Sequence, residues 1–134
     1  MDLDVIKIAE NTTNYKHIKN HSHKYKHKNT ICGDEIEITL KIKDRKIIDF
    51  GYQTKSCIYC QASASLLSRI SKNKKINEVN KFLEIAKDLF KEEHKSTPKY
   101  WKSFNSIFKK NNFQRKDCLL LPINALKKII NIYD

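Results

Sequence analysis

Apolar and polar residues alternate without interruption over residues 35–42, and this pattern predicts a half-buried β-strand. A second strand over residues 48–53 carries its apolar face on three alternate residues: Ile48, Phe50 and Tyr52. Residues 43–46 are all charged and predict the turn of an antiparallel hairpin. The two apolar faces are buried together only if even-numbered residues face even-numbered residues, for example Leu40 opposite Phe50 or Ile48.

Much of the remaining chain shows helical spacing. A short helix is expected over residues 3–10, with four apolar side chains turned inward: Leu3, Val5, Ile6 and Ala9. A second helix over 58–71 carries small residues that suit close packing against a sheet. A third helix over 76–91 carries one apolar stripe: Val79, Phe82, Leu83, Ala86 and Phe90.

Two prolines predict two further helix starts. Thr97 is expected to be an N-cap, with Pro98 at the first helical position and four large side chains following at helical spacing: Trp101, Phe104, Ile107 and Phe108. Pro122 is expected to begin the last helix.

Residues 11–31 are polar and contain four histidines: His17, His21, His23 and His27. Their loose spacing favours a solvated loop or an edge strand over a histidine metal site.

The composition narrows the class of protein. A chain of 134 residues with 40% apolar residues is expected to form one domain over residues 1–134. The longest apolar run, residues 119–123, is far shorter than the roughly 18 residues of a membrane span. The N-terminus also has no signal-peptide pattern. We therefore expect a cytoplasmic protein with no membrane partner, whose reduced thiols serve metal or sulfur chemistry rather than disulfides.

The formal net charge of +12 has two interpretations. It could serve an anionic partner, either a nucleic acid or an acidic protein surface. It could also follow from a composition rich in lysine, asparagine and isoleucine. Lysine recurs along the whole chain and few aromatic residues interleave with it, so we favour the second interpretation over a nucleic-acid partner.

Three of the four cysteines fall at the seams between predicted elements. Cys32 is expected to open the first strand, Cys57 to close the second strand and open a helix, and Cys118 to stand just before the last helix. The hairpin brings Cys32 and Cys57 to the same open end. A strict pleat would put Cys57 on the opposite face, so a bulge or turn near residues 55–56 is required for the two thiols to meet. Asp34, two residues after Cys32, points to the same side.

Helix N-termini stabilise anions, which favours the thiolate form at Cys57 and Cys118. Together with Cys32 and Asp34 they make a four-ligand set that suits zinc or an iron–sulfur cluster. The structural alternative for these cysteines is simple burial. Cys60 is open to three interpretations, which are a second ligand, a resolving thiol or a buried small hydrophobe, and the last is favoured.

The order of these motifs is specific. Cys32-Gly33-Asp34, a hairpin, Cys57 followed by the run Gln61-Ala62-Ser63-Ala64-Ser65, and a late cysteine resemble the NifU N-terminal, IscU and SufU family of iron–sulfur cluster assembly scaffolds. The similarity runs from about residue 14 to the C-terminus. It implies an α+β fold, with a small, mostly antiparallel three-stranded sheet and helices packed on one side.

The resemblance also implies roles for the site. Cys32, Cys57 and Cys118 would be cluster ligands or persulfide acceptors, and Asp34 would tune the lability of the cluster. Sulfur would arrive as persulfide from a cysteine desulfurase, and a [2Fe-2S] cluster would pass to recipient apoproteins.

The segment before Cys118, which contains Trp101, resembles the insertion of the SufU subgroup, whose members bind zinc at the same four positions. This implies an enzyme-class alternative, a zinc-dependent sulfurtransferase in which Cys118 accepts the persulfide sulfur. The chain has Asp117 where IscU proteins often have a histidine. Asp117 is then either an oxygen ligand or a solvated turn residue.

Overall fold

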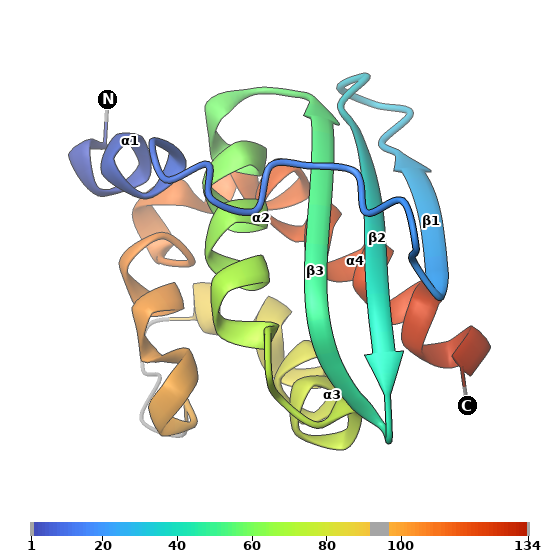
Figure 1. Ribbon diagram of the computed structural model, residues 1–134. Helices are drawn as coiled ribbons and strands as arrows, with labels where there is room; N and C mark the ends of the chain where they lie inside the picture. Colours follow the sequence, from blue (N-terminus) through green and yellow to red (C-terminus); the bar gives the residue numbers. More distant parts are fainter. Residues whose placement is uncertain (1, 92–96, 134) are drawn as a thin grey trace.

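A three-stranded antiparallel sheet in the order β1–β2–β3 is the centre of the fold (Figure 1). The computed structural model describes residues 2–91 and 97–133. Its elements in chain order are α1 (Leu3–Ala9), β1 (His23–Lys28), β2 (Glu35–Lys43), β3 (Lys46–Lys55), α2 (Ile58–Ser71), α3 (Ile76–Ile85), the 3₁₀ helices η1 (Ala86–Phe90), η2 (Lys99–Ser106) and η3 (Lys110–Arg115), and α4 (Lys116–Tyr133). The α+β class and the three-stranded sheet are confirmed.

The β2–β3 hairpin has the predicted register over most of its length. Leu40 pairs with Phe50, and both are fully buried. Asp44 and Arg45 form the turn with φ of 54° and 61°, as a two-residue type I′ turn requires. A register shift near the turn, between Lys41 and Ile42, changes the face of the next residues on β3.

Because of this shift, Ile47 is fully buried and Ile48 is exposed. The prediction that Ile48 belongs to the buried face was therefore wrong. A bulge near the turn cannot be seen in the period-2 pattern of either strand.

The helices α2 and α4 cover the apolar face of the sheet, α2 against β3 and α4 against β1 and β2 (Figure 1). Helix α2 has the bounds that the sequence predicts. Its small buried residues let α4 approach closely, and the buried Ser63 hydroxyl donates to the Leu119 carbonyl at 2.6 Å. This hydrogen bond ties together the two helices that carry Cys57 and Cys118.

Helix α4 begins six residues earlier than predicted, at Lys116, and Pro122 lies inside it. A proline lacks the N–H that would bond to the carbonyl four residues before, here that of Cys118. The helix tolerates this loss, and the prediction that Pro122 begins the last helix was wrong.

The N-terminal segment crosses the outer face of the sheet from β3 towards β1 (Figure 1). The Lys16 N–H donates to the Tyr52 carbonyl at 3.0 Å, and the Ile18 N–H donates to the Thr39 hydroxyl at 3.1 Å. The crossing runs directly over Gly51, where a Cβ atom would lie 2.6 Å from the Lys16 carbonyl oxygen. Only glycine leaves room for the chain there.

Strand β1 occupies the edge of the sheet, which confirms the expectation of an edge strand within residues 11–31. His27 faces α4, and burial together with the charge of Lys128 lowers its pKa. His17 contacts Glu37 at 3.1 Å, and the His21 ring contacts the Ile18 carbonyl at 2.7 Å.

The region after α3 is less regular than predicted. The expected helix over 76–91 is α-helical only to Ile85 and continues as η1. Pro98, rather than Thr97, is the N-cap of η2, and the Thr97 hydroxyl contacts the Asn105 side chain instead. The predicted apolar side chains are nonetheless buried, and the Trp101 ring stacks on Phe82 with 4.2 Å between ring centroids.

Helix α1 buries Val5 and Ala9 as expected, but Leu3 is 78% exposed, so the prediction for Leu3 was wrong. None of the described helices is long and apolar enough to cross a membrane.

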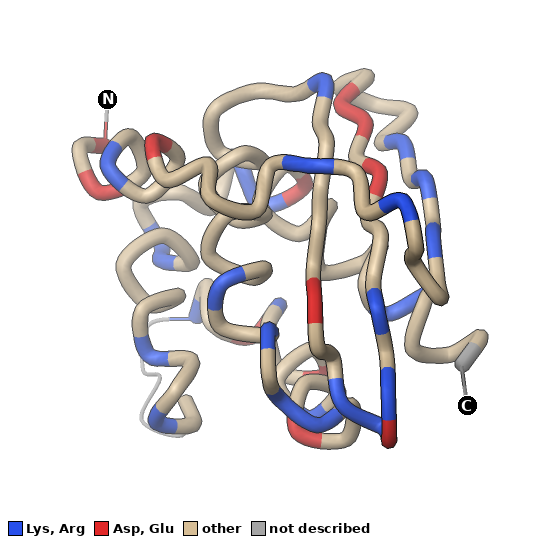
Figure 2. The backbone as a smooth tube through the Cα atoms, viewed as in Figure 1, with Lys and Arg blue, Asp and Glu red and all other residues tan. Residues whose placement is uncertain are grey.

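Lysine and arginine are spread over many elements of the fold (Figure 2). The loop between α2 and α3 pairs with the turn end of the hairpin through an antiparallel bridge between Lys46 and Lys75.

Candidate metal centre

Cys32 lies in the turn between β1 and β2. The turn is held by hydrogen bonds from the Gly33 N–H to the Asn29 carbonyl and from the Asn29 N–H to the Asp34 carbonyl, both at 2.8 Å. Gly33 has a φ of +80°, a conformation that favours glycine. Cys32 is exposed on this turn and does not open β2, so that prediction is corrected.

The other two predicted cysteine ligands lie at the beginnings of helices. Strand β3 ends at Lys55, and Cys57 is the N-cap of α2. The chain therefore leaves strand geometry near residues 55–56, as the pairing of even-numbered residues in the hairpin predicted. Cys118 is the third residue of α4 and is buried. It was predicted to stand before this helix, and the correction follows from the earlier start of α4.

Three of the four predicted ligands meet at one point. The ligand atoms of Cys32, Asp34 and Cys118 all lie within 4.8 Å of one another. Cys57 is outside this mutually close set of described residues, but it lies beside Cys118 and acts on the Cys118 thiol. The set contains no histidine.

Asp34 fits a metal site for a second reason. Its Oδ2 atom is shut off from solvent and has no hydrogen-bond partner among the described residues. A buried acceptor without a partner costs about 1–3 kcal/mol. Two sulfurs on one zinc ion at about 2.3 Å each are at most about 4.6 Å apart, so small side-chain adjustments would let this donor set hold one ion. The residues present therefore fit a zinc ion or an iron–sulfur cluster.

Burial raises the pKa of the Cys118 thiol, and the neighbouring Cys57 and Asp34 raise it further. The prediction that the helix start would favour the thiolate at Cys118 was wrong for the metal-free protein. Burial and two potentially anionic neighbours outweigh the helix dipole. A bound cation reverses this balance, because a coordinating thiol is deprotonated.

Cys60 is fully buried in the first turn of α2, in agreement with the favoured interpretation of its environment. Burial raises its pKa to about 12. Asp117 is exposed and lies outside the mutually close set.

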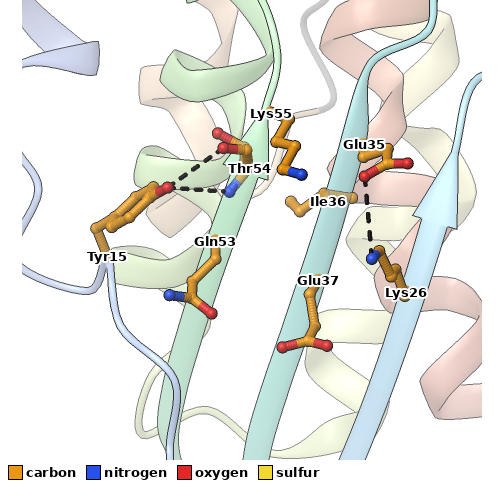
Figure 3. Close-up of a pocket in the computed structure, with 8 residues that line it drawn as sticks. All are labelled: Tyr15, Lys26, Glu35, Ile36, Glu37, Gln53, Thr54 and Lys55. Carbon is orange, nitrogen blue, oxygen red and sulfur yellow. Dashed lines mark hydrogen bonds and ion pairs between the residues drawn. The ribbon is translucent and has the colours of Figure 1, made fainter.

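A separate hollow of about 310 Å³ lies on the outer face of the sheet (Figure 3). It is lined by Tyr15, Lys26, Glu35, Ile36, Glu37, Gln53, Thr54 and Lys55. The Tyr15 hydroxyl donates to the Thr54 carbonyl, and Lys26 pairs with Glu35 at 4.0 Å (Figure 3). The hollow contains no cysteine, and sequence reasoning did not indicate it.

A family model described as the NifU-like N-terminal domain matches residues 3–107. The chain belongs to this NifU-like family. The match ends before Cys118, so the place of this cysteine in the NifU-like site rests on the geometry above.

This NifU-like chain is 30% identical over 105 residues to the iron–sulfur cluster assembly scaffold protein IscU 1 of Archaeoglobus fulgidus. The alignment covers 78% of the chain and 58% of that relative, so the chain spans less than two thirds of its length. It is also 29% identical over 103 residues to the IscU scaffold protein of Thermotoga maritima, covering 77% of the chain and 72% of that protein.

Two solved structures share the fold. One is described as an iron–sulfur cluster assembly scaffold for the SUF system of Fervidobacterium islandicum AW-1, with a TM-score of 0.84, 21% identity and coverage of 97% of this chain and 96% of that chain. The other is a NifU-like N-terminal protein of Brucella abortus, with a TM-score of 0.82, 20% identity and coverage of 96% and 90%.

Proposed function

We propose that this NifU-like chain is a scaffold on which an iron–sulfur cluster is assembled and from which it is passed on. The observation that carries the proposal is the convergence of Cys32, Asp34 and Cys118 within 4.8 Å, with Cys57 beside Cys118. The names of the IscU relatives support the same function.

The cargo is a [2Fe-2S] cluster with Cys32, Cys57 and Cys118 as thiolate ligands and Asp34 as the fourth. A two-iron cluster offers each ligand one of two iron atoms, so Cys57 need not lie within reach of the same ion as the others. A carboxylate is a harder donor than a thiolate and holds cluster iron less firmly. Asp34 therefore suits a cluster that has to leave.

The partners that this function requires are a source of sulfane sulfur, for which we propose a cysteine desulfurase, and recipient apoproteins. The sulfur arrives as a persulfide, and a thiolate of the site takes the outer sulfur while the donor cysteine leaves as a thiol.

A zinc-dependent sulfurtransferase is a second candidate, favoured by the close spacing of one oxygen and two sulfur donors. Zinc, when bound, would keep the thiols ionised. Cys118 would then accept the outer sulfur of a donor persulfide, and the site would not carry a cluster.

Anaerobic reconstitution with ferrous iron and sulfide tests the scaffold function. We expect stoichiometric iron and labile sulfide and a visible absorption spectrum that is lost in Cys57→Ser. Asp34→Cys should retain the spectrum but release the cluster to a chelator more slowly, because a thiolate holds cluster iron more firmly than a carboxylate does. Asp117→Ala is the control, because this exposed carboxylate lies outside the close set.

The same measurements separate the candidates. Tightly bound stoichiometric zinc that resists iron loading, together with stimulation of a cysteine desulfurase, supports the sulfurtransferase. A protein that takes up neither metal contradicts both candidates, and a Cys57→Ser variant that loads the cluster as well as the native chain contradicts the scaffold.

A further inference from the structure

Cys60 is a fourth thiol that the proposed function leaves unused. It is the third residue of α2 and has no exposed surface. Asp34, Cys57 and Cys32 all act electrostatically on its thiol, so it lies near the candidate metal centre.

The spacing of Cys57 and Cys60 brings them together at the start of α2. Cys57 is the N-cap with an extended backbone (φ −72°, ψ 168°), and its side chain makes no capping hydrogen bond. In a capping box the side chains at the N-cap and at the third helical position each reach the backbone N–H of the other residue, so both side chains lie at the same end of the helix. Cys57 accordingly influences the Cys60 thiol. A disulfide needs Cβ atoms about 3.5–4.5 Å apart, so joining the two sulfurs requires a local adjustment at the N-cap.

We propose that Cys60 is a resolving thiol, which attacks a persulfide carried on Cys57, releases hydrosulfide and leaves a Cys57–Cys60 disulfide. This inference rests on the proposed function, because it needs sulfane sulfur delivered to the site. The Cys60 sulfur bonds to the Cys57 sulfur, and the bond from Cys57 to the outer sulfur breaks. The outer sulfur takes the electron pair and the Cys60 proton and leaves as HS⁻, so the sulfane sulfur is reduced and the two cysteines are oxidised. A dithiol reductant then restores both thiols by exchange.

The surroundings divide the roles between the two cysteines. Cys57 is half-buried and stands before the free N–H groups of the first turn of α2, which stabilise an anionic persulfide. Cys60 has no exposed surface, so it is less open than Cys57 to a metal ion or a persulfide donor from solvent. Proximity makes up for its weak nucleophilicity, since effective molarities of oriented neighbouring groups reach about 10⁵ M or more.

The step has a consequence for assembly. Hydrosulfide is released beside Cys32, Asp34 and Cys118, where we propose that iron is held. Sulfur would thus be delivered in the oxidation state that a cluster contains, without an electron carrier acting at that step.

The test uses the reduced, metal-free full chain under anaerobic conditions. Glutathione persulfide loads the protein and is removed by gel filtration, and hydrosulfide release is then followed with time. Trypsin cleavage after Lys55 and Arg69 places both cysteines in one peptide, so mass spectrometry distinguishes a persulfide from an internal disulfide directly. We expect the native chain to release hydrosulfide and form the disulfide.

In Cys60→Ala and Cys60→Ser the persulfide should stay on Cys57, with hydrosulfide release slower by about tenfold or more. Tyr59→Phe, in the same turn of α2, is the control and should behave like the native chain. Circular dichroism confirms that the variants are folded.

Three outcomes overturn the inference: a persulfide on Cys57 that is equally stable in the native chain and in Cys60→Ala, a persulfide that moves to Cys60 without hydrosulfide release, or no persulfide on Cys57 in Cys60→Ala. Cluster reconstitution with free sulfide bypasses sulfur delivery. Its success alongside any of these outcomes leaves the scaffold function standing, whereas its failure ends the scaffold proposal.

Discussion

Two carboxylates of this lysine-rich domain, Asp34 and Asp49, have opposite surroundings: the residues that the structure describes supply cationic partners to Asp49 but not to the buried oxygen of Asp34. Asp49 lies on the outer side of β3, where Lys16 and Lys72 approach its oxygens at 3.0 and 3.3 Å and the Phe50 N–H donates to it. Asp34 lies beside Cys32 and Cys118, and its buried Oδ2 atom has no hydrogen-bond partner within the described part of the chain.

The difference is informative because cations are abundant. With 27 lysines and arginines, the chain supplies its own counter-charge at Asp49. The missing partner of the Asp34 Oδ2 atom is then best supplied from outside the chain, by a metal ion or an iron–sulfur cluster. Three predictions test this difference between Asp34 and Asp49.

The largest loss of stability is expected for Gly51→Ala, which displaces the segment that holds Lys16 against Asp49. The new Cβ atom would lie 2.6 Å from the Lys16 carbonyl oxygen, so the crossing segment that positions Lys16 has to move. We expect a loss of about 1–3 kcal/mol in the free energy of unfolding, measured by urea denaturation. Cluster loading at the thiol end should persist. A variant as stable as the native chain would show that the crossing segment moves at no cost.

The second prediction concerns the change in the free energy of unfolding of the metal-free protein, which should have opposite signs for two matched substitutions. Asp49→Ala should destabilise by about 1 kcal/mol, since it leaves two lysines without their partner. Asp34→Ala should instead be neutral or stabilising by about 1 kcal/mol, because it removes a buried acceptor without a partner. Chemical denaturation of both variants measures this. If Asp34→Ala destabilised as much as Asp49→Ala, Asp34 would already be satisfied within the chain.

The smallest effect is a pH dependence. Burial opposes ionisation of Asp49, but hydrogen bonds from Lys16, Lys72 and the Phe50 N–H lower its pKa below the ordinary value of 3.8. A lowered pKa in the folded state contributes stability above the unfolded pKa, and this contribution is lost as the pH falls from about 4 through the folded value.

Denaturation of the native chain and of Asp49→Asn between pH 6 and about pH 3 tests this. The variant should lose less stability over the acidic part of the range. Parallel curves for the two proteins would mean that Asp49 does not contribute.

Much of the fold could be predicted because local patterns determined it. The alternation over 35–42 and the small residues of 58–71 gave the hairpin register and the bounds of α2. The failures have physical causes. The shift at Ile42 depends on a bulge that leaves the alternation unchanged, and Pro122 is tolerated inside α4 because packing outweighs one lost hydrogen bond.

The sequence predicted which residues belong to the site better than it predicted how they are arranged. Order and spacing indicated Cys32, Asp34, Cys57 and Cys118, and the fold brings three of these together. The raised pKa of Cys118 was missed, because the burial of a side chain depends on where its helix begins. The position of Cys60 near the site likewise needed the packing of α2.

The turn that carries Cys32 is the most exposed part of the candidate metal centre. Cys118 is set into the packed body, and Cys57 begins a helix that is bonded to α4, whereas Cys32 sits on a surface connection held by a few short-range hydrogen bonds. A shift of that single connection would open the way out while the hydrophobic interior stays closed. Under the proposed scaffold function, loading and unloading of a cluster would then need far less energy than unfolding does.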